Sequence, residues 1–211
     1  HPMHIAENHI TLQFTSDAQV ICEPLFKNTP ITYFYYTRWY RAGRIFSIGT
    51  QPDWYRLFLE KDYYPRYSFI KNLPHNSFQL ISDCSFAGSR RNEALAVSRQ
   101  LNLGHFFSLS QHEEAYTSLI GFTIPFHHDV SFYFENIPLL ESFIYFFKDK
   151  AHQLIATYSQ EKHALEIPNY FDEDEKVSSL MNAHLFHHGR YYFNCNHQEN
   201  YVTQRELLCV Y

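Results

Sequence analysis

The most regular pattern in the sequence is an apolar stripe at helical spacing over residues 138–163. Apolar side chains recur there every three or four residues, while charged and polar side chains occupy the opposite face. The stripe comprises Leu139, Leu140, Phe143, Ile144, Phe147, Ala151, Leu154, Ile155 and Tyr158. It predicts one long amphipathic helix that covers a sheet. Such a helix could also pair with its copy, and Phe143, Phe147 and Leu154 are the residues expected at a dimer contact.

Runs of β-branched and aromatic residues, separated by turn residues, predict an antiparallel sheet. Residues 31–40 and 45–50 form the clearest hairpin, because the turn sequence R-A-G-R at residues 41–44 lies between them. Similar but shorter runs predict further strands at residues 78–82, 105–110, 116–124 and 130–134.

Shorter helices are predicted at residues 18–26, 54–63 and 89–101. Pro52 stands at the start of the second helix, where its missing N–H costs nothing. Gly104 follows the third helix and is suited to end it. Together with the long helix, these elements predict an α+β fold, an αβα sandwich in which helices flank a central antiparallel sheet, as in PAS/GAF-like domains.

Two further stretches follow the long helix. Residues 166–200 contain an acidic run at 172–175, a small hairpin at 185–193 and a linker. In residues 201–211, Thr203 can cap a helix and Glu206 stands where a capping box places its carboxylate. Leu207, Leu208 and Val210 would begin the apolar face of that helix. We therefore expect these residues to open a domain of which the chain contains only the start.

Composition narrows the class of protein. The 211 residues can form one substantial core, and a hydrophobic content of 45% argues against disorder. A formal charge of −5 provides no basic surface for nucleic acid, so DNA could be bound only through another domain. No stretch of about 18 uncharged apolar residues is present, which predicts no membrane helix. The four cysteines form no C-x-x-C pair, so a cytoplasmic protein with reduced thiols is expected.

The sequence contains no motif that predicts a catalytic site. There is no Gly-x-Ser-x-Gly elbow, and six glycines give no phosphate-binding loop. His184, His187 and His188 have spacing that a metal could use on a helix, but their turn-like context favours exposed histidines without metal. We predict no cofactor, no metal and no catalytic residue. A histidine-dependent metal sensor or enzyme is the weakest alternative.

The order of these features resembles the autoinducer-binding domain of LuxR-type transcription regulators. The hairpin at residues 31–50 is followed by Pro52-Asp53-Trp54 and a helix ending in Tyr63-Tyr64. The T-x-R-E sequence at residues 203–206 is similar to the first helix of the LuxR-type helix-turn-helix. The resemblance implies a sensor domain over residues 1–165, a linker region over residues 166–200 and the start of a DNA-binding domain at residues 201–211. It also implies a homodimer that contacts DNA only through that second domain.

The resemblance further implies a ligand pocket between the sheet and the helices on one face. Trp54 corresponds to the family tryptophan that donates its indole N–H to a lactone carbonyl. Phe58 stands one helical turn later, where the family has a tyrosine, so the tyrosine hydroxyl is missing here. Positions near Tyr67 and Ile81 correspond to the family's ligand-binding Asp and second Trp, and Phe106 lies near its glycine. The remaining residues expected to line the pocket come from the strands: Phe46, Ile48, Thr50 and Thr123.

The departures at Phe58 and Tyr67 argue against an acyl-homoserine lactone, because a buried ligand amide without an acceptor costs about 1–3 kcal/mol. A pocket for another apolar molecule, such as a fatty acid or lipid-like signal, is one interpretation. A pocket filled by its own aromatic side chains is the other, and it would make the domain a ligand-free dimerisation or protein-interaction module.

Overall fold

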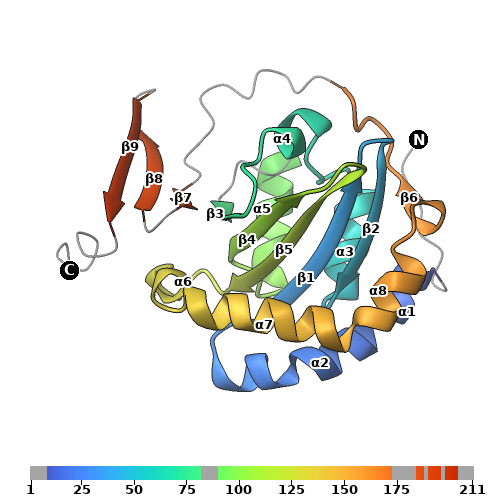
Figure 1. Ribbon diagram of the computed structural model, residues 1–211, viewed down its shortest axis with the longest axis horizontal. Coiled ribbons are helices and arrows are strands. Elements are labelled where there is room, and N and C mark those ends of the chain that lie inside the picture. The colour runs from blue at the N-terminus through green and yellow to red at the C-terminus, as the bar shows by residue number, and fades with distance from the viewer. Residues whose placement is uncertain (1–8, 82–89, 173–183, 188–189, 196–197, 204–211) are drawn as a thin grey trace.

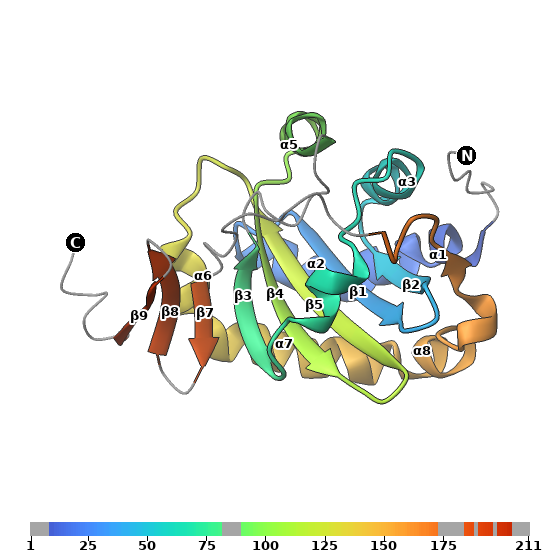
Figure 2. The same ribbon diagram turned by 90° about the horizontal axis from the view of Figure 1, so that it is seen from above.

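The computed structural model describes residues 9–81, 90–172, 184–187, 190–195 and 198–203 (Figure 1). These residues form three layers, with an antiparallel sheet in the middle and helices on both of its faces (Figure 2). The predicted α+β sandwich is confirmed. None of the described helices is long and apolar enough to cross a membrane.

The sheet has the strand order β6-β2-β1-β5-β4-β3-β7-β8-β9, and every neighbouring pair is antiparallel. The strands are β1 (Tyr33–Tyr40), β2 (Arg44–Gly49), β3 (Ser77–Ile81), β4 (His105–His112), β5 (Tyr116–Ile124), β6 (Leu165–Glu166), β7 (His184–His187), β8 (Arg190–Cys195) and β9 (Gln198–Thr203). The predicted hairpin is β1–β2, and β1 pairs with β5 on its other side.

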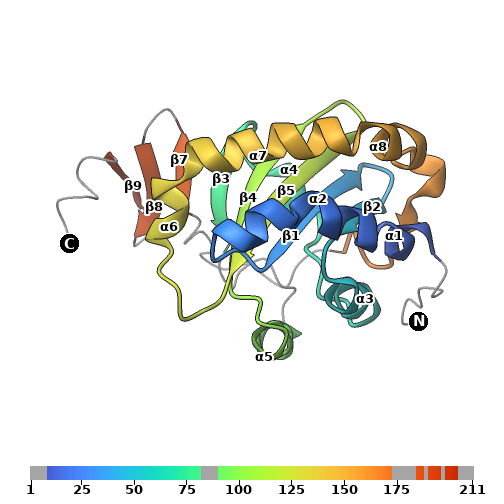
Figure 3. The ribbon, with the colours of Figure 1, turned by 90° about the horizontal axis from the view of Figure 1, so that it is seen from below.

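Helices α2 (Thr15–Asn28) and α7 (Ile137–Lys150) cover one face of the sheet, and α3 (Pro52–Glu60) and α5 (Arg91–Gln100) lie over the other (Figures 2 and 3). The remaining helices are α1 (Ile10–Gln13), α4 (Tyr67–Lys71), α6 (Ser131–Glu135), α8 (His152–Tyr158) and the short 3-10 helix η3 (Glu161–His163).

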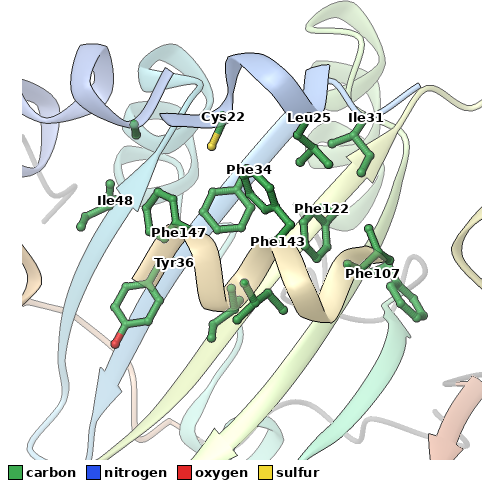
Figure 4. Close-up of a cluster of buried hydrophobic side chains, with 14 of the residues drawn as sticks. Cys22, Leu25, Ile31, Phe34, Tyr36, Ile48, Phe107, Phe122, Phe143 and Phe147 are labelled. Atoms are coloured by element: carbon green, nitrogen blue, oxygen red, sulfur yellow. The ribbon is translucent and has the colours of Figure 1, made fainter. Parts of the chain in front are cut away.

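The face under α2 and α7 is a single apolar core (Figure 4). Phe34 of β1 lies at its centre, with ring centroids 5.3 Å from Phe143 and 4.4 Å from Phe147. The stripe of α7 therefore covers the sheet as predicted. Phe143 and Phe147 are buried within their own chain, so their surface is used by the core and not by a dimer contact. Leu154 packs against the same cluster but is only partly buried, and a dimer contact at Leu154 stays a prediction.

Three predicted elements differ from the observed ones. The long helix is divided at Ala151, where the backbone turns before α8 begins. Residues 131–135 are helix α6 and not a strand, because the Asp129 carboxylate accepts the Ser131 N–H and starts a helical turn. The expected linker after residue 193 contributes to β8 and β9, in which Asn194 pairs with Glu199 and Cys195 with Gln198. Residues 204–211, with Glu206 and the apolar residues after it, lie outside the described residues.

Candidate ligand-binding site

The second face of the sheet is chemically different from the core under α7. Side chains alternate along β1, so Tyr33, Tyr35, Thr37 and Trp39 point away from α7 towards α3 and α4. Thr37 is paired directly with Ser47 of β2 and with Leu119 of β5. This face therefore combines aromatic rings with buried hydroxyl groups, whereas the α7 face is almost wholly apolar.

A cavity of about 70 Å³ lies between this face and the α3–α4 region. One enclosed water needs about 10–15 Å³ on the same measure, so the space exceeds an ordinary packing defect. The lining residues are Tyr33, Tyr35, Thr37, Trp39, Ile45, Ser47, Trp54, Tyr55, Phe58, Pro65, Phe69, Phe106 and Leu119. In contrast to the single core under α7, the buried apolar residues here form two clusters, and both contribute to the cavity wall.

Both tryptophans of the chain line the cavity. Trp54 enters from α3, and its ring centroid lies 6.0 Å from that of Phe58 and 5.9 Å from that of Phe106. Trp39 enters from the sheet and stacks on Tyr170, with centroids 5.9 Å apart and an interplanar angle of 12°. Phe58 contacts Trp39 as well, at 6.3 Å, so the two indoles are connected through one phenyl ring.

Most polar groups of this wall are paired within the protein. The Thr37 and Ser47 hydroxyl oxygens lie 3.0 Å apart, and the Tyr35 hydroxyl bonds to the Ser108 hydroxyl. Burial raises the pKa of Tyr35 to about 12, although the Ser108 hydrogen bond opposes that rise. Burial is also the main cause that raises the pKa of Tyr33 well above its ordinary value. Both phenols are therefore uncharged at neutral pH.

The indole N–H of Trp39 differs from these paired groups. Trp39 is only 3% exposed, and among the described residues its Nε1 atom has no hydrogen-bond partner. Buried hydrogen-bond donors are normally paired within the protein, because they have lost their hydrogen bonds to water. An unpaired donor on a cavity wall marks a place where a ligand atom can be recognised.

No charged side chain lines the cavity among the described residues. Asp62, the carboxylate nearest in sequence to the family's amide-binding Asp, forms a bidentate ion pair with Arg66 at 2.6 and 2.9 Å. It is therefore not a lining residue. A metal-binding cluster of three His, Cys, Asp or Glu side chains is also absent from the described part of the chain. Of the proposed histidine cluster, His188 is not described, and the side chains of His184 and His187 lie outside what the structure describes.

The residues predicted to line the pocket divide into two groups. Trp54, Phe58 and Phe106 are brought together as expected. Phe46 and Ile48 belong to the core under α7, because they lie on the opposite face of β2 from Ile45 and Ser47, and they are corrected to core residues. The side chain of Ile81 is not described, although its backbone pairs with Phe106 on β4.

The other three residues do not line the cavity. The Thr50 hydroxyl accepts the Phe34 N–H at 3.1 Å, so it holds the start of β1 in place. Thr123 is fully buried and its hydroxyl lies 3.4 Å from that of Thr32. Tyr67 packs on Tyr170, with centroids 5.7 Å apart. These three are therefore corrected to supporting residues.

The sequence interpretation missed the contribution of β1, which supplies Tyr33, Tyr35, Thr37 and Trp39. Their two-residue spacing is visible in the sequence, and it places them on one face of a strand. What the spacing does not reveal is that this mixed face, and not the more apolar face of Phe34 and Tyr36, borders the cavity.

Comparison with known proteins adds no assignment. A scan against protein-family models and a search of curated proteins both find no match to this chain. What the site does is therefore inferred from its own geometry and from the motifs of the sequence.

Proposed function

We propose that this chain is the ligand-sensing and dimerisation domain of a LuxR-type transcription regulator, with an apolar small-molecule ligand other than a standard acyl-homoserine lactone. The observation that carries the proposal is the apolar cavity between the sheet and α3, with Trp54 and Phe58 in its wall. This is the position at which the resemblance leads us to expect a ligand. The T-x-R-E motif at residues 203–206 supports the assignment to a regulator that contacts DNA through a helix-turn-helix domain.

The lining supports a ligand without an amide N–H that requires a carboxylate acceptor. Asp62 is engaged with Arg66, and among the described lining residues the side-chain acceptors are all hydroxyl oxygens. A ligand amide would lose the charge-assisted hydrogen bond that the family's Asp supplies. This favours an apolar molecule with few donors of its own.

Strand β1 offers a physical route from the cavity to the helix layer on the opposite face. Tyr35 and Trp39 line the cavity, while Phe34, one residue from Tyr35, packs on Phe143 and Phe147 of α7. A ligand that displaces β1 would therefore repack α7. In a dimeric regulator, such repacking would change the spacing of the two DNA-binding domains.

The test is thermal unfolding of the chain with a panel of neutral apolar molecules, compared with the variant Leu119→Phe. Leu119 lines the cavity, so the larger ring narrows it without adding charge. Compounds that bind only the native chain raise its melting temperature, by an amount that grows with the ratio of ligand concentration to dissociation constant. We expect stabilisation of the wild type and a loss of that stabilisation in the variant. Equal stabilisation of both proteins would place binding elsewhere.

A ligand-free interaction module is the second candidate, and the size of the cavity favours it. The volume of about 70 Å³ is below the roughly 150 Å³ of an engineered cavity that binds benzene. In addition, α7 exposes Leu139, Tyr145 and Phe146 to solvent by 45%, 74% and 40%. If no compound stabilises the chain while the chain self-associates through these residues, the second candidate replaces the first.

A further inference from the structure

The wall of the cavity that β1 forms is rich in hydrogen-bond donors. Trp39 supplies an indole N–H, which can donate and cannot accept. Thr37 lies two residues before it on the same face, and its hydroxyl is 3.0 Å from that of Ser47. One proton is used between these two hydroxyls, so the pair retains a second proton that it can donate. The polar end of the cavity thus offers donors from two neighbouring sites.

The rest of the wall is uncharged. Aromatic, aliphatic and proline side chains account for most of it, and no lysine, arginine or histidine is present among the described lining residues. A carboxylate placed here would have no counter-ion, and an ionised group buried without one is strongly disfavoured. This argues against the fatty-acid anion that the sequence left open.

We infer that the ligand of this cavity is an uncharged molecule whose hydrogen-bond acceptor, such as a carbonyl oxygen, pairs with the indole N–H of Trp39. The inference rests on the proposed function, because it names the chemical class of the ligand at the same site. It follows from two observations: Trp39 lines the cavity, and its buried Nε1 atom has no hydrogen-bond partner among the described residues. Trp54 of α3 would then make apolar contact with the ligand, and Trp39 of the sheet would donate the hydrogen bond to its acceptor.

The cavity volume indicates how such a ligand would lie. About 70 Å³ holds a small head group but not a long chain. The head group would sit against Trp39, with the apolar remainder extending along Trp54 and Phe58. A small ketone is therefore a suitable probe, since it places one carbonyl oxygen beside a short alkyl chain.

The test uses heteronuclear NMR of the isotope-labelled chain, which has two indole N–H signals because it has two tryptophans. Trp39→Phe and Trp54→Phe assign them by removing one signal each. Three probes of nearly equal shape are titrated: methyl pentyl ketone, the alkene in which a CH₂ group replaces the carbonyl oxygen, and hexanoate. Comparing their affinities separates the contribution of the hydrogen-bond acceptor from that of the apolar contact and from the effect of a negative charge.

We expect the ketone to move the Trp39 indole proton downfield in a saturable way. The alkene should bind about three- to tenfold more weakly, which corresponds to one net hydrogen bond. Hexanoate should not bind. Trp39→Phe should weaken binding of the ketone by the same factor and leave the affinity for the alkene unchanged. Tyr145→Phe, on the exposed side of α7, is the matched control and should alter none of these values.

Two other outcomes are distinguishable. If ketone and alkene bind equally well and the Trp39 signal does not move downfield, or if hexanoate binds as tightly as the ketone, the inference is overturned while the cavity remains a ligand site. If none of the three probes shifts either indole signal, the proposed function fails, and the inference fails with it. The wild-type signals answer the question even if Trp39→Phe does not fold.

Discussion

Gly121 leaves the space that the ring of Tyr35, a residue of the cavity wall, occupies. It is paired with Tyr35 on β1 and with Ser108 on β4. A Cβ atom at Gly121 would lie 2.3 Å from the Tyr35 ring and 2.7 Å from the Ser108 hydroxyl oxygen. The missing side chain therefore lets the Tyr35 ring cross β5 and bond to Ser108. Tyr35 in turn forms part of the cavity wall.

Replacing Gly121 with Ala should lower the free energy of unfolding by about 1–3 kcal/mol, as expected for overpacking against the partly buried Tyr35 ring. Urea denaturation measures the loss. The same substitution in a Tyr35→Ala background is the control, because the clashing ring is then absent and most of the loss should disappear. A cost that is equal in both backgrounds would contradict the contact between Gly121 and Tyr35.

Tyr35 also gives the stability a defined dependence on pH. Its pKa is about 12 in the folded chain, because burial disfavours the phenolate, and about 10 when unfolded. The folded state therefore retains a proton that the unfolded state loses. This contribution to stability is complete below about pH 10 and is lost as the pH rises from 10 towards 12.

Unfolding by urea at a series of alkaline pH values should show this decline, and Tyr35→Phe should show a shallower one. Tyr33 and Tyr133 act in the same direction, so the variant should reduce the slope without abolishing it. An identical slope in the variant and the wild type would exclude Tyr35 from the effect.

At the scale of elements, α7 shows how far a sequence pattern extends. The three- and four-residue spacing of its apolar positions located the helix and its buried face. It did not reveal the interruption at Ala151, nor that Phe143 and Phe147 are buried in the core. Periodicity identifies which face is apolar, but it carries no information on what covers that face.

Two adjacent residues of α7 offer a direct check of its orientation. Phe147 is fully buried, whereas Phe146 is 40% exposed. Phe147→Ala should lower the free energy of unfolding by about 3–5 kcal/mol, and Phe146→Ala by about 0.5 kcal/mol or less. Thermal or urea unfolding of the two variants side by side measures this difference. Comparable losses would contradict the packing of α7 described above.

The exposed side of α7 is also where a dimer contact can still form. Leu139, Tyr145 and Phe146 are the exposed large apolar residues of this helix. If two copies pair there, Tyr145→Ser combined with Phe146→Ser should convert the dimer to a monomer, because the contact loses both of its aromatic rings. Sedimentation velocity measures the change. The matched control is Val20→Ser on α2, which is 72% exposed and should leave the oligomeric state unchanged.

A dimer that persists in the double variant would place the contact on another surface. A chain that is monomeric before any substitution would remove dimerisation from the proposal and leave the ligand site unaffected.

The site was less predictable than the fold because its residues come from four separate parts of the chain. Trp54, Phe58 and Phe106 were expected from the resemblance to the LuxR-type domain, and all three line the cavity. Thr37, Ser47 and Leu119 become neighbours only through the register of three strands. Successive residues of β2 point to opposite faces of the sheet, so Ser47 lines the cavity while Phe46 and Ile48 enter the core under α7.

For the whole molecule, the two sheet faces perform different tasks. The face under α2 and α7 is one continuous core and supplies stability. The face under α3 and α4 contains two clusters, the cavity and an unpaired indole N–H. A protein selected for stability alone would gain by filling that space and pairing that donor. We interpret this local loss of stability, from the unfilled cavity and the unpaired donor, as evidence for a binding site.

Native mass spectrometry of the purified chain, after exposure to an extract of neutral small molecules, tests that conclusion most directly. We expect an adduct on the order of a few hundred daltons, as for a small-molecule site. It should be released intact on denaturation, so that it can be identified, and it should be absent from Leu119→Phe. An unmodified mass for the wild-type chain under the same conditions, whether monomeric or dimeric, would contradict a ligand sensor and favour the ligand-free interaction module.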